Sequence, residues 1–233
     1  MENLFLQYLR ETSAKFTRHE DKIPHSKPVI TISREYGCPG ERIAEKLILT
    51  LIKKNHAAGG KDNWHWVSKE IIEESAQKLK ITPSLMQELS KKSDEGLFDG
   101  FASFFADKFY PSDRKIQNTI ASFIYTAAIK GNVVILGRAS EIITRNFINA
   151  LHIKLYAPLD WRTEVTSINE SVSMGTAKRL CEDNDARREG FRHYFRGEKE
   201  SSGFYDAMFN CKELNDDEII EMVLILAETR GFV

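Results

Sequence analysis

The chain has 233 residues, of which 42% are hydrophobic and 29% are charged, and its formal net charge is −1. These values are typical of a folded globular protein, and the near-neutral charge excludes a large basic surface for duplex nucleic acid. No segment approaches the roughly 20 apolar residues that span a membrane, so we expect neither a nucleic-acid nor a membrane partner.

The cysteine and histidine patterns argue against disulfides and histidine metal sites. Cys38, Cys181 and Cys211 are odd in number and far apart, which favours a reducing compartment. The six histidines lack the spacing of metal ligands. The N-terminus has no secretory pattern. We therefore expect a cytoplasmic protein.

Residues 1–22 have apolar residues at roughly helical spacing and are predicted to form an amphipathic helix. Two prolines in residues 23–28 end this helix and make a linker. The helix either packs on the body of the protein or mediates self-association. The predicted organisation is therefore a helix and linker over 1–28, followed by one domain over 29–233.

The rest of the chain alternates between strand and helix patterns. Strands are predicted at 29–32, 64–67, 133–136, 151–156 and 205–209. Helices are predicted from the apolar face at 43–52 to an end near Gly59-Gly60, and at 68–79, 83–92, 113–130 and 216–230, with a longer helical region at 160–196. Asn215 and Glu218 resemble a capping box for the last helix. This alternation predicts an α/β fold with a parallel sheet covered by helices on both faces. Ligands of such sheets bind at the carboxyl ends of the strands.

The loop after the first strand is the first candidate site. It runs from Ser33 to Gly40 and enters a helix, so its backbone N–H groups lie at the positive end of the helix dipole. Gly37 and Gly40 permit close backbone approach, and Arg34 and Arg42 add positive charge. The pattern indicates a phosphate site, although the same residues could form only a turn.

Two further segments add arginines. Arg138 follows a predicted strand and is either a cleft residue or a surface ion-pair partner. Residues 183–196 contain four arginines within ten positions, and Arg188 and Arg192 share a helix face. They could clamp phosphates, or form a solvated charged helix in which Asp185 pairs with Arg188. Together, the three segments match what phosphoryl transfer demands, which is positioning and nearby cations.

Five segments resemble, in order, the motifs of the cytidylate kinase-like family. The matching segments are Ile32-Ser33-Arg34-Glu35-Tyr36-Gly37 with Gly40 and Ile43-Ala44-Glu45-Lys46-Leu47; Val134-Ile135-Leu136-Gly137-Arg138; Tyr156-Ala157-Pro158 with Arg162; Asp185, Arg188 and Tyr194; and Tyr205-Asp206 with Asn210. The resemblance covers about residues 29–228.

The resemblance implies the P-loop nucleoside-monophosphate-kinase fold, with a five-stranded parallel sheet in the order 2-3-1-4-5. By resemblance, residues 68–130 supply the acceptor side and residues 160–200 an arginine-bearing lid. ATP and Mg²⁺ are the implied cofactors, and the ligand is a nucleotide or other small phosphate-bearing molecule. The implied site residues are Arg138, Arg188 and Arg192 for catalysis, and Ser33, Arg34, Gly37, Cys38, Gly40, Glu41, Arg42 and Asp185 for phosphate or nucleotide binding.

The chain departs from the cytidylate kinase loop at important positions. Gly40 occupies the motif position of the lysine that binds phosphate, and Arg42 occupies the position of the hydroxyl residue that binds Mg²⁺. Cys181 replaces the first lid arginine, and Ala139 replaces an aspartate after the strand. Arg34 or Arg42 could supply the missing charge. No spacing selects the Mg²⁺ ligands.

Three functions remain open from the sequence. The first is transfer of the γ-phosphoryl group of ATP to a nucleoside monophosphate or other small acceptor. The second is nucleotide or phosphate binding without turnover, because the loop lacks its lysine. The third is a partner-binding module that uses the N-terminal helix and an aromatic cluster formed by Phe98, Phe101, Phe104, Phe105 and Phe109.

Overall fold

The computed structural model describes residues 27–57, 59, 64–67, 120–121, 124–125, 127–196 and 202–233. Several predictions lie outside these residues: the N-terminal helix and its self-association, the two helices predicted at 68–79 and 83–92, and the aromatic cluster. Most of the predicted acceptor side also lies outside them.

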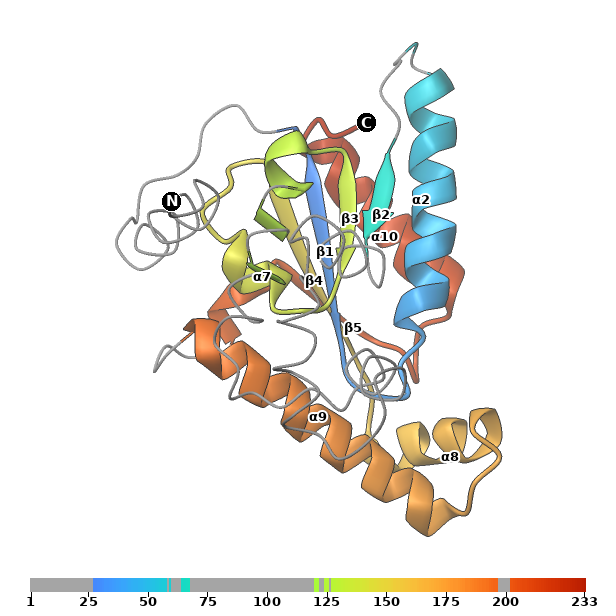
Figure 1. The fold of residues 1–233 in the computed structure, drawn as a ribbon. Coiled ribbons are helices and arrows are strands. Elements are labelled where there is room, and N and C mark those ends of the chain that lie inside the picture. Colours follow the sequence, from blue (N-terminus) through green and yellow to red (C-terminus); the bar gives the residue numbers. More distant parts are fainter. Residues whose placement is uncertain are drawn as a thin grey trace, which may run out of the picture.

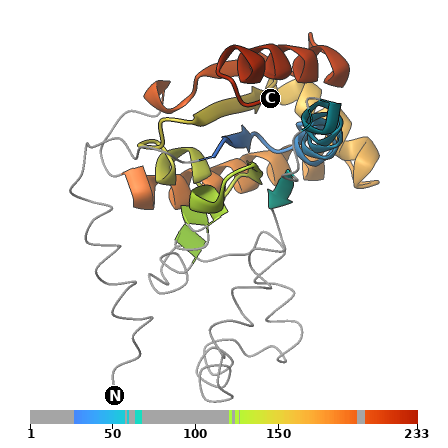
Figure 2. The same ribbon diagram turned by 90° about the horizontal axis from the view of Figure 1, so that it is seen from above.

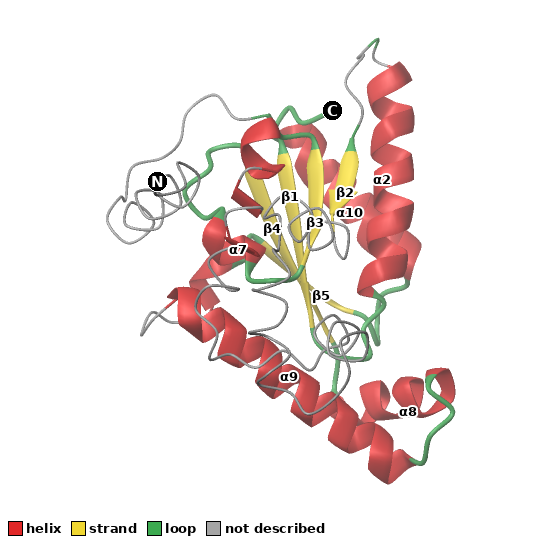
Figure 3. Ribbon diagram, viewed as in Figure 1, coloured by secondary structure: helices red, strands yellow, loops and turns green. Residues whose placement is uncertain are grey.

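The described residues form a five-stranded parallel sheet in the order β2-β3-β1-β4-β5, which confirms the predicted fold class. The strands are β1 (Val29–Arg34), β2 (His65–Val67), β3 (Val133–Leu136), β4 (Ala150–Tyr156) and β5 (Ala207–Asn210). All five run in one direction (Figure 3). The register pairs Ile32 of β1 with Leu136 of β3, so the segments that follow these two strands begin at the same level.

The labelled helices are α2 (Gly40–Ala57), α7 (Ser140–Ile143), α8 (Leu159–Asn169), α9 (Met174–Arg196) and α10 (Asp216–Thr229), and a 3₁₀ turn, η1, covers Ser202–Phe204. The described residues between 120 and 130 are also helical. The longer helical region predicted for 160–196 consists of two helices, because a turn separates α8 from α9. The strand predicted at 205–209 begins two residues later.

The sheet is the middle of three layers, with α10 on one side and α7 and α9 on the other (Figures 1 and 2). On the first face, apolar residues of α2 and α10 such as Leu47 and Val223 pack against Ile30 and Ile153. On the second face, Ile124, Ile142 and Phe191 pack against strand residues. Burial on both faces explains the continuous β-branched run of β1.

Two local signals shape α10 and the joint between α8 and α9. The side chain of Asn215 accepts hydrogen bonds from the N–H groups of Asp217 and Glu218, and Glu218 bonds back to the N–H of Asn215, so the predicted capping box is confirmed. Ser171 has a positive φ in the turn between α8 and α9. Within the described part of the chain, no helix has the length and apolar character that a membrane span requires.

Candidate functional site

A cleft of about 880 Å³ lies at the carboxyl ends of the strands. Its walls come from the β1–α2 loop, the turn after β3, one face of α8 and α9, and single residues of β4 and the η1–β5 segment. Figure 1 shows α8 and α9 crossing this end of the sheet. The position is the one at which ligands bind to open parallel sheets.

The cleft brings together every candidate site residue predicted from the sequence. The residues that line it include Ser33, Arg34, Gly37, Cys38, Gly40, Glu41, Arg42, Arg138, Asp185, Arg188 and Arg192. They come from three segments that are far apart in the chain. Their individual roles remain predictions, and their hydrogen bonds distinguish them from one another.

The backbone of the β1–α2 loop offers fewer N–H groups to a ligand than its sequence implied. The N–H of Cys38 donates to the carbonyl of Glu35 at 3.2 Å, and that of Gly40 donates to the carbonyl of Cys38 at 2.8 Å. Pro39 has no N–H group. Among the described residues of the loop, the N–H groups of Gly37, Glu41 and Arg42 have no backbone acceptor.

Gly37 is required where the loop touches α8. Its φ is +88°, and a Cβ atom at this position would lie 3.0 Å from the carbonyl oxygen of Arg162 and from Oγ1 of Thr166. Any side chain would therefore be strained by its backbone conformation and pushed against α8. The loop and α8 are thus held in direct contact.

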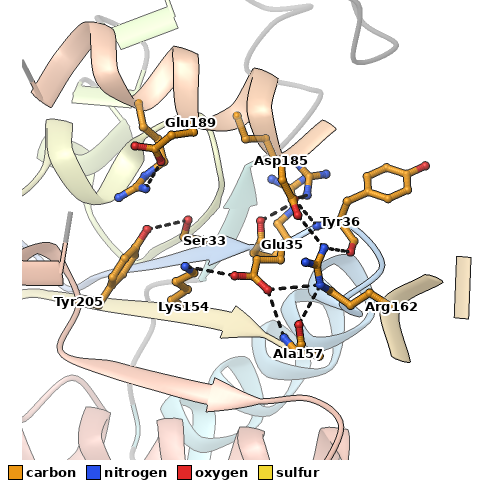
Figure 4. Close-up of polar contacts among 12 residues, drawn as sticks. Ser33, Glu35, Tyr36, Lys154, Ala157, Arg162, Asp185, Glu189 and Tyr205 are labelled. Carbon is orange, nitrogen blue, oxygen red and sulfur yellow. Dashed lines mark hydrogen bonds and ion pairs between the residues drawn. The ribbon is translucent and has the colours of Figure 1, made fainter. Parts of the chain in front are cut away.

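A buried arginine fixes this contact, and its role was missed by sequence reasoning. Figure 4 shows Arg162 among Glu35, Asp185, Tyr36 and Ala157. Its guanidinium donates to the carbonyls of Ala157 (2.9 Å) and Tyr36 (3.0 Å) and to Asp185 (2.6 Å), and its Nε lies 3.3 Å from Glu35. Only 9% of the side chain is exposed. The sequence offered one signal for this role, because Arg162 is the arginine of the family motif that begins Tyr156-Ala157-Pro158.

Asp185 links α9 to the loop. Besides Arg162, it accepts the N–H of Tyr36 at 2.7 Å. Its ion pair with Arg188 is longer, at 3.9 Å. The carboxylate is thus committed mainly to Arg162 and the loop backbone, which is a positioning arrangement. Its predicted contact with the nucleotide remains untested.

The two arginines that flank the loop differ in their surroundings. Arg42 forms a two-point ion pair with Asp216 at the start of α10, with Nη2 3.0 Å from Oδ1. The hydrogen bond from Arg42 lowers the pKa of Asp216, so the pair is charged at neutral pH. By contrast, the side chain of Arg34 runs from β1 past Gly40 to Gly137.

Arg138 lies on a strained turn at the end of β3. Gly137, Arg138 and Ala139 have φ values of 72°, 59° and 55°. Left-handed backbone costs about 1–2 kcal/mol for each residue other than glycine. Such strain is found most often at functional sites, where the surrounding structure imposes it. Here the turn holds Arg138 in the lining of the cleft.

The arginines of α9 have different partners. Arg188 donates to the carbonyl of Arg34 at 3.3 Å and stacks over the ring of Tyr36 at 5.3 Å. Arg192 bonds Glu141 of α7 at 2.6 Å and Glu189 at 2.7 Å. Although burial opposes the charged form, Glu141 raises the pKa of Arg192 above its usual value. Its positive charge is therefore balanced by two carboxylates.

The buried Glu141 and the half-buried Tyr205 form a polar group beside Ser33, and neither was assigned a role from the sequence. The Glu141 side chain is fully buried, and Tyr205 donates to Oγ of Ser33 at 3.1 Å. Burial and the charge of Glu141 raise the pKa of Tyr205, which keeps its hydroxyl protonated. Lys154 of β4, 3.4 Å from Glu35, adds a further cation to the cleft.

Cys38 faces the thiol of Cys211 rather than acting as an anion in the loop. A hydrogen bond from Cys38 to Cys211, together with burial, raises the pKa of Cys38, and the same hydrogen bond lowers that of Cys211. Cys38 consequently stays a neutral thiol at physiological pH. It places no negative charge beside a bound phosphate.

Comparisons with known proteins bear on the family and the fold of the chain. Residues 29–213 match the model of the cytidylate kinase-like family. A search of curated proteins finds no match. Solved structures that match include a protein from Eubacterium ventriosum ATCC 27560, described as uncharacterized, with 21% identity and a TM-score of 0.57, covering 87% of this chain and 99% of that one. Another is the shikimate kinase from Bacteroides thetaiotaomicron, with 14% identity and a TM-score of 0.47, covering 87% and 97%. At 21% identity, the similarity to the Eubacterium ventriosum protein shows a shared fold and nothing further.

Proposed function

The chain belongs to the cytidylate kinase-like family, and on this premise we propose that it is a nucleotide-dependent phosphotransferase. The reaction is transfer of the γ-phosphoryl group of ATP to a nucleoside monophosphate of the cytidylate kind, or to another small acceptor. The observation that carries the proposal is the convergence of Arg34, Arg138 and Arg188 from three elements on one cleft. Phosphoryl transfer needs this arrangement, because the enzyme's main task is to position phosphates and stabilise their charge.

The cleft fits the phosphates of ATP. Its volume of about 880 Å³ suits a nucleotide-sized ligand. The amide groups of Gly37, Glu41 and Arg42 lie where the loop enters α2, and such helix ends favour anions. Arginine side chains can then hold phosphate oxygens in two-point contacts.

Mg²⁺ fits only as a companion of the nucleotide. The described residues contain no group of three or more His, Cys, Asp or Glu side chains that could hold a metal ion. Mg²⁺ is commonly bound by substrate phosphates and water with one or two carboxylates. The ion would neutralise phosphate charge, and Glu41 and Ser33 are side chains of the cleft that could offer it oxygen.

Within this proposal the residues have separate tasks. Arg138 and Arg188 bind the phosphate oxygens on which charge develops. Arg162, Glu35 and Asp185 position the loop against α8 and α9. Arg192 reaches phosphate only if it leaves Glu141 or Glu189, so it makes a smaller contribution than its position in the sequence motif suggested. A cytoplasmic location remains a prediction from the cysteine content.

A second candidate function is nucleotide binding without turnover. The hydrogen bonds that use the amides of Cys38 and Gly40 within the loop favour it, as does the absence of a lysine at position 40. This candidate predicts that ATP stabilises the protein but is not consumed.

The two candidates are separated by ³¹P NMR of the purified full chain with Mg-ATP and a pool of nucleoside monophosphates. Phosphotransferase activity predicts ADP and a second diphosphate that appears only with its acceptor. Arg188→Ala should then lower turnover by about 100-fold or more. Arg179→Ala, an exposed arginine on the same helix, is the matched control and should leave turnover unchanged.

Stabilisation by Mg-ATP in a thermal melt, with no acceptor-dependent product, would favour the binding candidate. Equal turnover in Arg188→Ala and Arg179→Ala would remove Arg188 from the mechanism.

A further inference from the structure

The side chain of Arg34 lies against the place where the Cβ atom of any residue at position 40 would stand. Arg34 is the last residue of β1, and Gly40 is the first residue of α2. A Cβ atom at position 40 would lie 3.0 Å from Cγ of Arg34 and 3.2 Å from its Cδ. The aliphatic part of Arg34 is therefore packed against the Cα atom of Gly40.

The guanidinium of Arg34 ends at the turn after β3. A Cβ atom at position 137 would lie 2.1 Å from Nη1 of Arg34, so a side chain at this position would displace the guanidinium. Arg34 thus crosses from the phosphate loop to the turn that carries Arg138. In a parallel sheet, the two segments it spans are at the same level, because Ile32 is paired with Leu136.

We propose that Arg34 is the catalytic cation of the loop, taking the place of the lysine that P-loop kinases carry at the position of Gly40. In such loops the lysine reaches the β- and γ-phosphates. This proposal rests on the function proposed above. It selects Arg34 over Arg42 because the side chain of Arg34 lies along Gly40, whereas Arg42 is 65% exposed and is directed to Asp216 on α10.

An arginine at position 34 and a lysine at position 40 are alternative ways to place a cation at the loop. Gly40 has an ordinary backbone conformation, since it is not among the glycines with positive φ. A lysine at this position would therefore be crowded by the stem of Arg34 and by Leu136, whose Cδ1 would lie 3.3 Å from the Cβ atom, and not by the backbone. Shortening residue 34 should make room for a lysine at 40, whose ammonium group could extend into the same cleft.

The chemistry asked of Arg34 is electrostatic. An acceptor phosphate oxygen bonds to the γ-phosphorus as the bond from that phosphorus to the β,γ-bridging oxygen breaks, and ADP leaves with the electron pair. Arg34 donates N–H groups to the phosphate oxygens and transfers no proton. A planar guanidinium can contact two oxygens at once, which a lysine ammonium does less directionally.

The test is an exchange of charge between positions 34 and 40. The variants are Arg34→Ala, Gly40→Lys and the double variant Arg34→Ala/Gly40→Lys, with Arg179→Ala as the control. Each is measured for Mg-ATP affinity by calorimetry and, where the wild type turns over, for kcat/KM. Arg34→Ala should lose about 100-fold or more in kcat/KM, and it should bind Mg-ATP more weakly.

The double variant should recover at least tenfold of that loss, whereas Gly40→Lys alone should gain nothing because the arginine stem blocks the lysine. Arg34→Met keeps the packing without the charge and replaces Arg34→Ala if the alanine variant fails to fold. Unchanged affinity and turnover in Arg34→Met, or a folded double variant no better than Arg34→Ala, would overturn the proposal.

The readouts separate this proposal from the proposed function. If the wild type binds Mg-ATP without turnover, the phosphotransferase proposal and the catalytic role of Arg34 both fail. A loss of affinity in Arg34→Met and its recovery in the double variant would then assign Arg34 to phosphate binding alone. If the wild type turns over and Arg34→Met does too at the same rate, only the assignment of Arg34 fails.

Discussion

Replacing Arg162 by glutamine tests the network that joins the phosphate loop to α8 and α9. The side chain of Arg162 is 9% exposed, and its guanidinium contacts two carbonyls and two carboxylates. Glutamine keeps part of the volume and polarity but removes the charge. The variant therefore leaves Glu35 and Asp185 close together without their shared cation.

The size of the expected loss of stability follows from the burial of Arg162. Removing one partner of a buried ion pair costs about 3–5 kcal/mol. Glu35 and Asp185 are each about one quarter exposed, and each keeps another partner: Lys154 for Glu35 and the N–H of Tyr36 for Asp185. These features reduce the cost, so we expect the free energy of unfolding to fall by about 3 kcal/mol, the lower end of that range.

The assay is urea denaturation followed by circular dichroism. A thermal melt gives a second readout: for a domain of this length, 1 kcal/mol corresponds to about 2–4 °C in Tm, so the melting temperature should fall by about 6–12 °C. Arg179→Gln removes an exposed arginine from α9 and should change the free energy of unfolding by less than about 0.5 kcal/mol. Equal unfolding free energies for the two variants would refute the claim that this network stabilises the site.

Other predictions concern single residues of the fold. Burial lowers the pKa of His152 to about 4. Because the unfolded state takes up a proton near pH 6.5 and the folded state does not, the free energy of unfolding should fall as the pH is lowered from 6.5 to 4, by about 3 kcal/mol in total. Urea titrations at pH 7 and 4.5 should show this decrease. The variant His152→Gln should make the free energy of unfolding depend less on pH. Gly37→Ala should destabilise by at least about 1–2 kcal/mol because of its positive φ, whereas Gly175→Ala, at a helical glycine with open space, should be neutral or slightly stabilising in the same denaturation assay. Asn215→Ala removes the cap of α10 and should lower the free energy of unfolding by about 1 kcal/mol; an unchanged midpoint would show that the cap contributes nothing.

Local patterns were sufficient for most elements of the sheet layer. The β-branched runs of β1 and β3 and the cap at Asn215 depend on residues close in sequence, and all three were predicted. The order of the strands came from the family resemblance. The break between α8 and α9 had a local signal that was overlooked: the hydroxyl of Ser173 accepts the N–H of Thr176, an N-terminal cap for α9.

The partners of the site residues could not be predicted, because they come from distant parts of the chain. Arg42 pairs with Asp216 across 174 positions, and Arg162 bonds the carbonyl of Tyr36 across 126. A sequence pattern indicates that an arginine is near a loop, but not which carboxylate faces it. The motif arginines were therefore predicted to lie near one another, and they do line one cleft, but their ion pairs were not predicted.

These ion pairs change the interpretation of the arginine-rich site. Arg42 and Arg192 are each bound to carboxylates, so the positive potential of the cleft is smaller than its number of arginines implies. Under the proposed function, phosphate binding depends on the geometry of Arg34, Arg138 and Arg188 as well as on the total charge of the cleft. It follows that these three contacts require the loop, the strained turn after β3 and α9 to keep their relative positions. The Arg162 network and the Arg192–Glu141 pair hold α9 at two points along its length, and both are therefore part of how a loop without a lysine could still bind phosphate.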